Sequence, residues 1–339
     1  MSDRVLVTGV SGFLGGHTAL ELLKRGYTVR GSVRDSTRAD AVRTSLAAAG
    51  AETSRLEVCV LDLLDDEGWQ EAIRGCRYLV HVASPFVLKM PKDEQDLIRP
   101  AVEGTRRAIQ AALSAGVQRV ALTSSLAAID GGHATYDRAL SVDDWTKLDG
   151  PRVNAYARSK TLAEREAWSL MDRAGARDRL AVINPGTLLG PLLDDDPGTS
   201  VGILRQVLKG EMPMLPNLIL PFVDVRDVAE SHAAVLTAPG AGGRRHILTN
   251  RAQSLSEIAA ILRSNLPEDS SRVPRIRMPD WAAHLLSFFD SSLRDSRAYL
   301  GVRRLYDSST GNALLQRCPR PIADSVVVTA RSLLERGLA

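Results

Sequence analysis

The sequence predicts an α/β protein with a doubly wound parallel sheet and a smaller, mostly helical C-terminal lobe. Short, continuously apolar runs alternate with helical patterns through about the first 190 residues. That alternation is typical of parallel strands covered by helices on both faces. A glycine-rich turn lies directly between the first apolar run and the first helical pattern. Because crossover connections are right-handed, the helices are expected on both sides of one sheet.

The first half of the chain supplies six strands and five helices in alternation. Each apolar run is short enough for a buried strand, and each helical pattern has apolar positions three or four residues apart. Gly26 closes the first helix, as expected for a helix C-terminus. The expected strands are 4–10, 27–34, 56–63, 78–84, 119–125 and 179–186, and the expected helices are 17–26, 38–50, 68–74, 100–115 and 155–174.

The pattern changes after about residue 190. Segments 190–202 and 209–222 are rich in Pro, Gly and Asp, which predicts loops around a short helix. A short strand with a helix at 222–236 and a strand at 244–250 follow, and the remainder is largely helical up to 322–338. We therefore divide the chain into a sheet domain of 1–190, to which 222–248 returns, and a smaller lobe of 191–221 and 249–339.

The composition excludes several classes of protein. The net charge is +3, and no basic run suggests nucleic acid as a partner. Cys59, Cys76 and Cys318 lack metal-ligand spacing and are odd in number, which favours structural thiols in a reducing compartment, with no metal site. There is no apolar run of about 18 residues and no signal-peptide pattern, so no membrane partner and a cytoplasmic location are expected.

The glycine-rich turn predicts a dinucleotide site. "VTGVSGFLG" places Gly9, Gly12 and Gly15 between the first strand and the first helix. Glycine there permits a tight turn and lets backbone N–H groups approach a pyrophosphate at the helix N-terminus. Ligands of such sheets bind outside the carboxyl ends of the strands, so we expect the site in the cleft between the lobes.

The end of the second strand favours NADPH over NADH. Arg34 lies there, and Arg38 follows one helical turn later. A guanidinium matches the 2′-phosphate that distinguishes NADPH. Asp35 is the counter-argument, because its carboxylate could receive a ribose hydroxyl or cap the helix. Asp62, which closes the third strand, is placed to reach the adenine ring or to cap the segment after it.

A tyrosine and a lysine lie one helical turn apart in "NAYARSKTLAE". Tyr156 and Lys160 share a helix face, since positions i and i+4 are neighbours. A lysine beside a core tyrosine needs no function, whereas a nearby cation can also prepare a phenol for proton transfer. Ser124 and Ser125 end the strand before this helix, and either hydroxyl could donate to a carbonyl oxygen.

Taken together, these motifs resemble the extended short-chain dehydrogenase/reductase superfamily. Within it, the chain is similar to the dihydroflavonol reductase, cinnamoyl-CoA reductase and aldehyde reductase branch, whose fold is a Rossmann-type sheet with a substrate-binding lobe. The matching stretches span roughly residues 5 to 235. They include "VTGVSGFLG", "SVRD", "HVASP", "LTSS", "YARSKTLAEREAW", "INPGTLLGP" and "FVDVRDVAESH".

The resemblance implies roles for individual residues. Tyr156 would be the general acid, Lys160 would bind the nicotinamide ribose and lower the pKa of the tyrosine, and Ser125 fits the family's serine better than Ser124. Classical members extend a proton relay through an asparagine that 99–109 lacks, and we expect Asn154 to cap the tyrosine helix. The other cofactor contacts implied are Ser11, Phe13, Leu14, Leu63, Val82, Ala83, Ser84, Pro185 and Leu188.

The expected activity is hydride transfer from NADPH to the carbonyl of a hydrophobic aldehyde, ketone or dihydroflavonol-like substrate. Two alternatives stay open: an NAD-dependent nucleotide-sugar epimerase or dehydratase, and a non-catalytic NADP-binding sensor. The oligomeric state is expected to be a monomer or a homodimer. The candidate walls of the substrate pocket are mostly apolar, although each could equally be core: Phe86, Leu126, Tyr136, Trp145, Leu188 and the 213–222 loop with Phe222.

Overall fold

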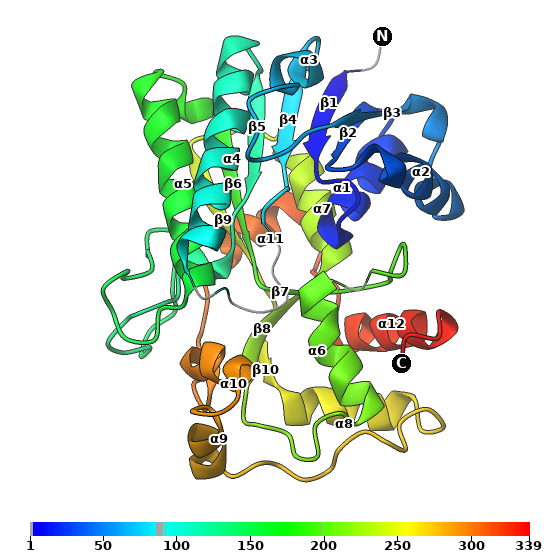
Figure 1. The fold of residues 1–339 in the computed structure, drawn as a ribbon, viewed down its shortest axis with the longest axis vertical. Coiled ribbons are helices and arrows are strands. Elements are labelled where there is room, and N and C mark those ends of the chain that lie inside the picture. The colour runs from blue at the N-terminus through cyan, green and yellow to red at the C-terminus, as the bar shows by residue number, and fades with distance from the viewer. Residues whose placement is uncertain (1–2, 86–90, 92, 197) are drawn as a thin grey trace.

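A seven-stranded parallel sheet forms the centre of the protein (Figure 1), in a computed structural model that describes residues 3–85, 91, 93–196 and 198–339. The strand order is β3-β2-β1-β4-β5-β6-β9, so the order reverses between β1 and β4. That reversal is where ligands bind in doubly wound sheets. The strands are β1 (Arg4–Thr8), β2 (Thr28–Val33), β3 (Leu56–Val60), β4 (Tyr78–His81), β5 (Arg119–Thr123), β6 (Leu180–Pro185) and β9 (Arg244–Leu248).

Helices cover both faces of this sheet and form two apolar cores with it, as the sequence predicted. One core includes α1 (Phe13–Lys24), α2 (Ala39–Ala48) and α7 (Val225–Ala234). The other includes α3 (Trp69–Ile73), α4 (Gln95–Ser114) and α5 (Ala155–Arg173). Helix α4 begins five residues before the expected start at 100 and contains Pro100. The proline removes one helical hydrogen bond, and burial of Leu97, Ile98 and Ala101 on the same turns stabilises the helix across it.

The smaller lobe contains a three-stranded sheet that the sequence pattern did not predict. Its order is β10-β8-β7, from β7 (Thr187–Leu189), β8 (Ile219–Asp224) and β10 (Ala252–Ser254). The core of this lobe includes side chains of α6 (Gly198–Lys209), α8 (Leu255–Asn265) and α12 (Ile322–Glu335). The remaining helices are α9 (Asp280–Leu286), α10 (Ser291–Asp295) and α11 (Ser309–Leu315). Of the segment 222–248, β9 joins the large sheet, while β8 pairs within the small one.

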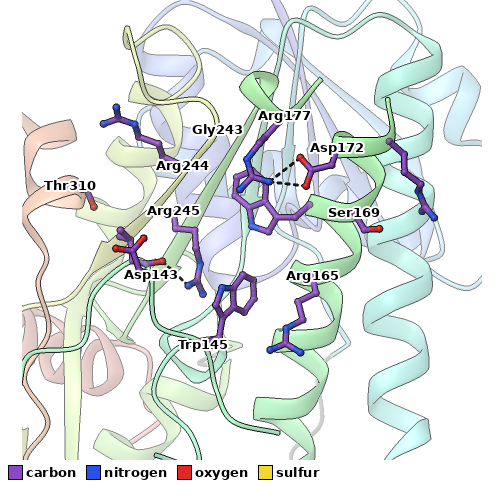
Figure 2. Close-up of a pocket in the computed structure, with 13 residues that line it drawn as sticks. Asp143, Trp145, Arg165, Ser169, Asp172, Arg177, Gly243, Arg244, Arg245 and Thr310 are labelled. Carbon is purple, nitrogen blue, oxygen red and sulfur yellow. Dashed lines mark hydrogen bonds and ion pairs between the residues drawn. The ribbon is translucent and has the colours of Figure 1, made fainter. Parts of the chain in front are cut away.

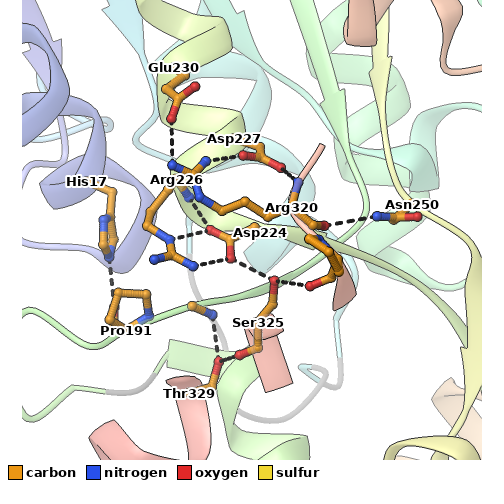
Figure 3. Close-up of polar contacts among 12 residues, drawn as sticks. His17, Pro191, Asp224, Arg226, Asp227, Glu230, Asn250, Arg320, Ser325 and Thr329 are labelled. Carbon is orange, nitrogen blue, oxygen red and sulfur yellow. Dashed lines mark hydrogen bonds and ion pairs between the residues drawn. The ribbon is translucent and has the colours of Figure 1, made fainter. Parts of the chain in front are cut away.

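The loop after β7 is fixed from both lobes (Figure 3). The backbone N–H of Gly190 donates to Thr329 of α12 at 2.7 Å, and a ring nitrogen of His17 on α1 lies 2.8 Å from the carbonyl oxygen of Pro191. Nearby, the hydroxyl of Ser325 on α12 donates to the buried carboxylate of Asp224 at 2.7 Å. These contacts hold a chain segment that faces the carboxyl ends of the large sheet.

In the part of the chain that the structure describes, no helix has the length and hydrophobicity needed to cross a membrane. Within the same residues, no cluster of three or more histidine, cysteine or acidic side chains is arranged to hold a metal ion. The thiol of Cys76 is buried, that of Cys59 is partly buried, and that of Cys318 is exposed.

Candidate active site

The turn between β1 and α1 depends on two glycines. Gly9 has a φ of +73°, in the left-handed region that favours glycine, and its N–H donates to the Ser32 carbonyl at 3.1 Å. At Gly15, a Cβ would lie 2.0 Å from the carbonyl oxygen of Gly9, so no side chain fits there. Gly12 precedes α1 without a side-chain cap. The N–H groups of the first helical turn are therefore available to an anion.

Neighbouring strand ends come together beside this turn. The hydroxyl oxygen of Thr8 accepts from the backbone N–H groups of Val82 and Ala83, each at 3.0 Å. The Cα of Ala83 lies 3.1 Å from the position of a Cβ on Gly9. This packing brings Val82 and Ala83 against the turn from Gly9 to Gly15, which we call the phosphate loop. Ser84 follows them and is partly buried. Phe86 lies outside the described residues.

Of the remaining residues of the phosphate loop, Ser11 and Phe13 are partly exposed, whereas Leu14 is buried in the core of the sheet. Leu63 packs against α4, where a Cβ on Gly104 would lie 2.8 Å from its side chain. Beneath the loop that follows β6, Pro185 is buried and Leu188 is partly buried. Their contacts with a cofactor stay predictions.

Two arginines are exposed near the end of β2. Arg34 is exposed, and Arg38 is exposed with a nitrogen 3.8 Å from a carboxylate oxygen of Asp194. The carboxylate of Asp35 accepts from the backbone N–H of Thr37 at 2.9 Å, so it caps the turn at 36–38. That hydrogen bond lowers the pKa of Asp35. Of the two roles open to Asp35, the structure shows the cap, and both guanidinium groups remain exposed.

Asp62, at the carboxyl end of β3, also binds the local backbone. Its carboxylate accepts from the N–H of Leu64 at 2.8 Å, and the residue is exposed. Its expected contact with an adenine ring remains a prediction.

Ser125, Tyr156 and Lys160 come together at the carboxyl end of β5 and the start of α5. Asn154 caps α5 by accepting from the N–H of Ala157 at 2.9 Å, which confirms the expected cap. The hydroxyl of Ser125 lies close enough to Tyr156 to lower the pKa of the phenol. The ammonium nitrogen of Lys160 lies 5.9 Å from the centre of the Tyr156 ring.

Ser124 points elsewhere. It is buried, and its hydroxyl donates at 2.6 Å to the carboxylate of Glu164, one turn after Lys160. The same carboxylate accepts from three further side chains, which belong to α5, β6 and β9: Trp168 at 3.2 Å, Asn184 at 2.9 Å and Arg245 at 2.6 Å. Of the two adjacent serines, the structure thus brings Ser125 to the tyrosine and gives Ser124 a structural contact.

Burial is the main influence on both ionisable groups of the candidate site. It raises the pKa of Tyr156 above its usual value, opposed by the nearby hydroxyl of Ser125. It lowers the pKa of Lys160 to about 8, opposed by the negative charge of Glu164. The lowering of the Tyr156 pKa by Lys160 that the resemblance implied is therefore not seen, because burial raises that pKa.

A buried polar cluster forms around Asp130, and the sequence analysis missed it. A carboxylate oxygen of Asp130 lies 2.9 Å from the guanidinium of Arg304 and accepts from the hydroxyl of Tyr306 at 2.7 Å. Tyr299 also donates to this carboxylate, at 3.1 Å. The charge of Asp130 contributes to the raised pKa of Tyr156. No motif links residue 130 to residues 299–306, which meet only in the folded chain.

The other predicted walls of the substrate pocket have different surroundings. Tyr136 is partly buried and stacks on Arg304 at 4.4 Å. Leu126 and Phe222 are each 2% exposed and pack in apolar cores, so their contact with a substrate stays a prediction. Trp145 lies 4.0 Å from the guanidinium of Arg245 and lines a cavity beside the C-terminal half of α5.

Known proteins are similar to this chain in sequence and in fold. A family model described as "NAD dependent epimerase/dehydratase family" matches residues 5–249. Cinnamoyl-CoA reductase 1 of Arabidopsis thaliana is 36% identical over 268 residues, which are 78% of this chain and 75% of the relative. Cinnamoyl-CoA reductase CAD2 of Medicago truncatula is 30% identical over 344 residues, covering 100% of this chain and 98% of the relative.

Among solved structures, the chain is similar to yeast methylglyoxal/isovaleraldehyde reductase Gre2 complexed with NADPH. The TM-score is 0.81 at 24% identity, with 99% of this chain and 100% of the yeast chain covered. That likeness shows a shared fold over the whole length, including the smaller lobe.

Proposed function

Since the chain belongs to the NAD-dependent epimerase/dehydratase family, in its cinnamoyl-CoA reductase and aldehyde reductase branch, we propose that it is an NADPH-dependent carbonyl reductase. The proposed substrate is a hydrophobic aldehyde, ketone or dihydroflavonol-like compound. The observation that carries the proposal is the grouping of Tyr156 with two partners: the ammonium nitrogen of Lys160 lies 5.9 Å from the centre of the tyrosine ring, and the hydroxyl of Ser125 acts on the phenol.

The residues of the phosphate loop fit a dinucleotide. The absence of a side chain at Gly15 leaves room for a pyrophosphate. The start of α1 has no side-chain cap, so its backbone N–H groups can donate to that anion. Arg34 and Arg38 are exposed beside this loop and would hold a 2′-phosphate. One carboxylate oxygen of Asp35 already accepts from the backbone N–H of Thr37, which supports its role as a cap.

When bound, NADPH would supply a hydride to the carbonyl carbon of the substrate. Tyr156 would donate a proton to the carbonyl oxygen, and its raised pKa keeps the phenol in the protonated form that reduction requires. Ser125 would donate a hydrogen bond to the same oxygen and so stabilise the charge that develops there. Lys160, with a pKa of about 8, is mostly charged at neutral pH and would donate to ribose hydroxyls.

The cluster around Asp130 would shape the far side of the substrate site. Tyr299 and Tyr306 are held by the Asp130 carboxylate, and Arg304 is stacked between the rings of Tyr136 and Tyr299 at 4.4 and 4.2 Å. Rings fixed in this way would present a rigid wall to an apolar substrate, because their hydroxyls are already satisfied.

The proposal is tested by Tyr156→Phe, which removes one oxygen atom. We expect turnover of NADPH with a panel of aldehydes, ketones and dihydroflavonols to fall at least about 100-fold, while NADPH affinity, measured by fluorescence titration, is unchanged. Tyr27→Phe is the matched control, because Tyr27 lies just before β2 and packs edge-on against Tyr78 at the amino end of β4, whereas the candidate site lies at the carboxyl ends of the strands. A Tyr156→Phe variant with near wild-type turnover would refute the assignment of the acid.

The same assays separate the reductase from the epimerase alternative. An epimerase would retain tightly bound NAD through purification. It would not oxidise NADPH with any of the carbonyl compounds. Extraction of the purified protein and identification of the released nucleotide decides between the two.

A further inference from the structure

A cavity of about 800 Å³ lies at the opposite end of α5 from Tyr156 (Figure 2). Its walls are the C-terminal half of α5, the loop before α5 and the first residues of β9. None of the proposed catalytic or cofactor-binding residues lines it. Ser169, on its wall, lies 13 residues after Tyr156, which corresponds to about 20 Å along the helix axis. The cavity is therefore separate from the active site.

Five arginines line this cavity, and two of them are held rigidly. Arg177 forms a two-point pair with Asp172, at 2.8 and 2.9 Å, and lies 4.5 Å over the ring of Trp168. Arg245 is buried, pairs with Glu164 at 2.6 Å and lies 4.0 Å over the ring of Trp145. Both guanidinium groups are thus fixed against an indole face, with their charge matched by a carboxylate.

The other three arginines have no acidic partner. Arg165, Arg173 and Arg244 are exposed, and none forms an ion pair within the described part of the chain. Arg165 lies 5.2 Å over the second face of the indole that Arg245 covers. Asp143 is the one carboxylate on the wall that likewise has no basic partner among the described residues. Two positive charges therefore remain uncompensated around the cavity.

Cations on several walls of one hollow match a ligand with several negative charges. A guanidinium presents a planar fork of N–H donors that pairs with two oxygens of a phosphate or carboxylate. Stacking on a tryptophan restricts the guanidinium, so less conformational entropy is lost when the anion binds. The volume lies within the range of small-molecule sites and exceeds what a single inorganic phosphate would fill.

We propose that this cavity binds a small multivalent oxyanion, a polyphosphate or a polycarboxylate, through Arg165, Arg173 and Arg244. The site is independent of the proposed reductase activity, and its ligand is recognised by charge. Trp145 and Trp168 serve to hold the neighbouring guanidinium groups, since Trp168 is only 6% exposed and offers no free ring face.

The test is calorimetric titration with pyrophosphate, citrate and sulfate at constant ionic strength. Saturating NADP⁺ is present throughout to fill the phosphate loop, so that any further binding occurs elsewhere. We expect one additional site per chain, with pyrophosphate or citrate binding more tightly than sulfate. The preferred probe identifies which of the two chemical classes the site takes.

The variant Arg165→Gln/Arg173→Gln/Arg244→Gln should lose more than tenfold in affinity for the preferred probe. Its control, Arg99→Gln/Arg275→Gln/Arg331→Gln, removes the same charge from exposed arginines outside the cavity and should bind like the wild type. Equal affinity in the wild type and the cavity variant, or no binding of any probe, would overturn the proposal. NADPH-dependent turnover without added anion should be the same in all three proteins, so a failure here is distinct from a failure of the reductase assignment.

Discussion

Glu164→Gln is expected to be among the most destabilising single changes on α5, although it alters one atom. The Glu164 carboxylate is buried and accepts from Ser124, directly after β5, and from side chains of α5, β6 and β9. Its pair with Arg245 has exposed fractions of 0% and 7%. The amide removes the negative charge and leaves the Arg245 guanidinium unpaired inside the protein. The change therefore weakens the points at which three strands meet the helix.

The magnitude follows from the burial of both partners. Breaking a buried ion pair from one side costs about 3–5 kcal/mol. With an unfolding entropy of about 2.1 cal/mol/K per residue, a chain of 339 residues has about 0.7 kcal/mol/K in total. The melting temperature should therefore fall by about 4–7 °C, as measured by differential scanning calorimetry.

Glu166→Gln is the matched control, two residues along the same helix. Glu166 pairs with Arg106 at 2.8 Å on the surface, with exposed fractions of 20% and 38%, and a pair of this kind is worth less than about 1 kcal/mol. In the double variant Glu164→Gln/Arg245→Met, the buried unpaired cation is gone, so part of the lost stability should return. A melting temperature for Glu164→Gln equal to that of Glu166→Gln would refute this account of the network.

Three further predictions follow from the site. Gly15→Ala places a Cβ 2.0 Å from the Gly9 carbonyl oxygen and should weaken NADPH binding more than tenfold in a fluorescence titration, whereas Gly202→Ala, with no atom within 4 Å, should leave binding unchanged. Arg34→Ser should raise the KM for NADPH about 10- to 100-fold and leave that for NADH unchanged, since it would remove the charge-assisted hydrogen bond that we propose between Arg34 and the 2′-phosphate; equal effects on both cofactors would contradict the assignment. The folded-state pKa of Lys160 is about 8 against 10.5 in the unfolded chain, so the folded state loses its proton first and stability rises with pH between those values. In urea denaturation, the free energy of unfolding of the wild type should rise by up to about 3 kcal/mol across that pH range, relative to Lys160→Met. A difference between the two proteins that does not change with pH would contradict the prediction.

Much of the large sheet could be predicted because its strands carry their own signal. Runs such as residues 120–122 and 180–183 are apolar, and each is followed or preceded by a helical pattern. The small sheet has no such signal. Strands β7 and β10 have three residues each, too few to be distinguished from a loop. Of β8, only the end was predicted, as the short strand that begins at Phe222, because Pro221 interrupts the run before it.

In the candidate site, too, local motifs could be predicted from the sequence, whereas contacts between distant residues could not. The phosphate loop and the Tyr156–Lys160 pair are local patterns, in which spacing along the chain fixes spacing in the structure. The pairs Asp130–Arg304 and Glu164–Arg245 join residues that lie far apart in sequence, and no spacing rule connects them. The direction of the Tyr156 pKa shift also required the structure, because burial cannot be read from a helix turn alone.

The order in which the chain visits its two sheets constrains protein engineering. After β6 the backbone enters the small sheet for β7 and β8, returns to the large sheet for β9 and leaves it again for β10. A chimera that exchanges the smaller lobe with that of a relative therefore needs three splice points, because a single crossover would join half of one lobe to half of another. Recombination libraries of this fold should be designed with paired exchange blocks, and single-junction hybrids are expected to misassemble.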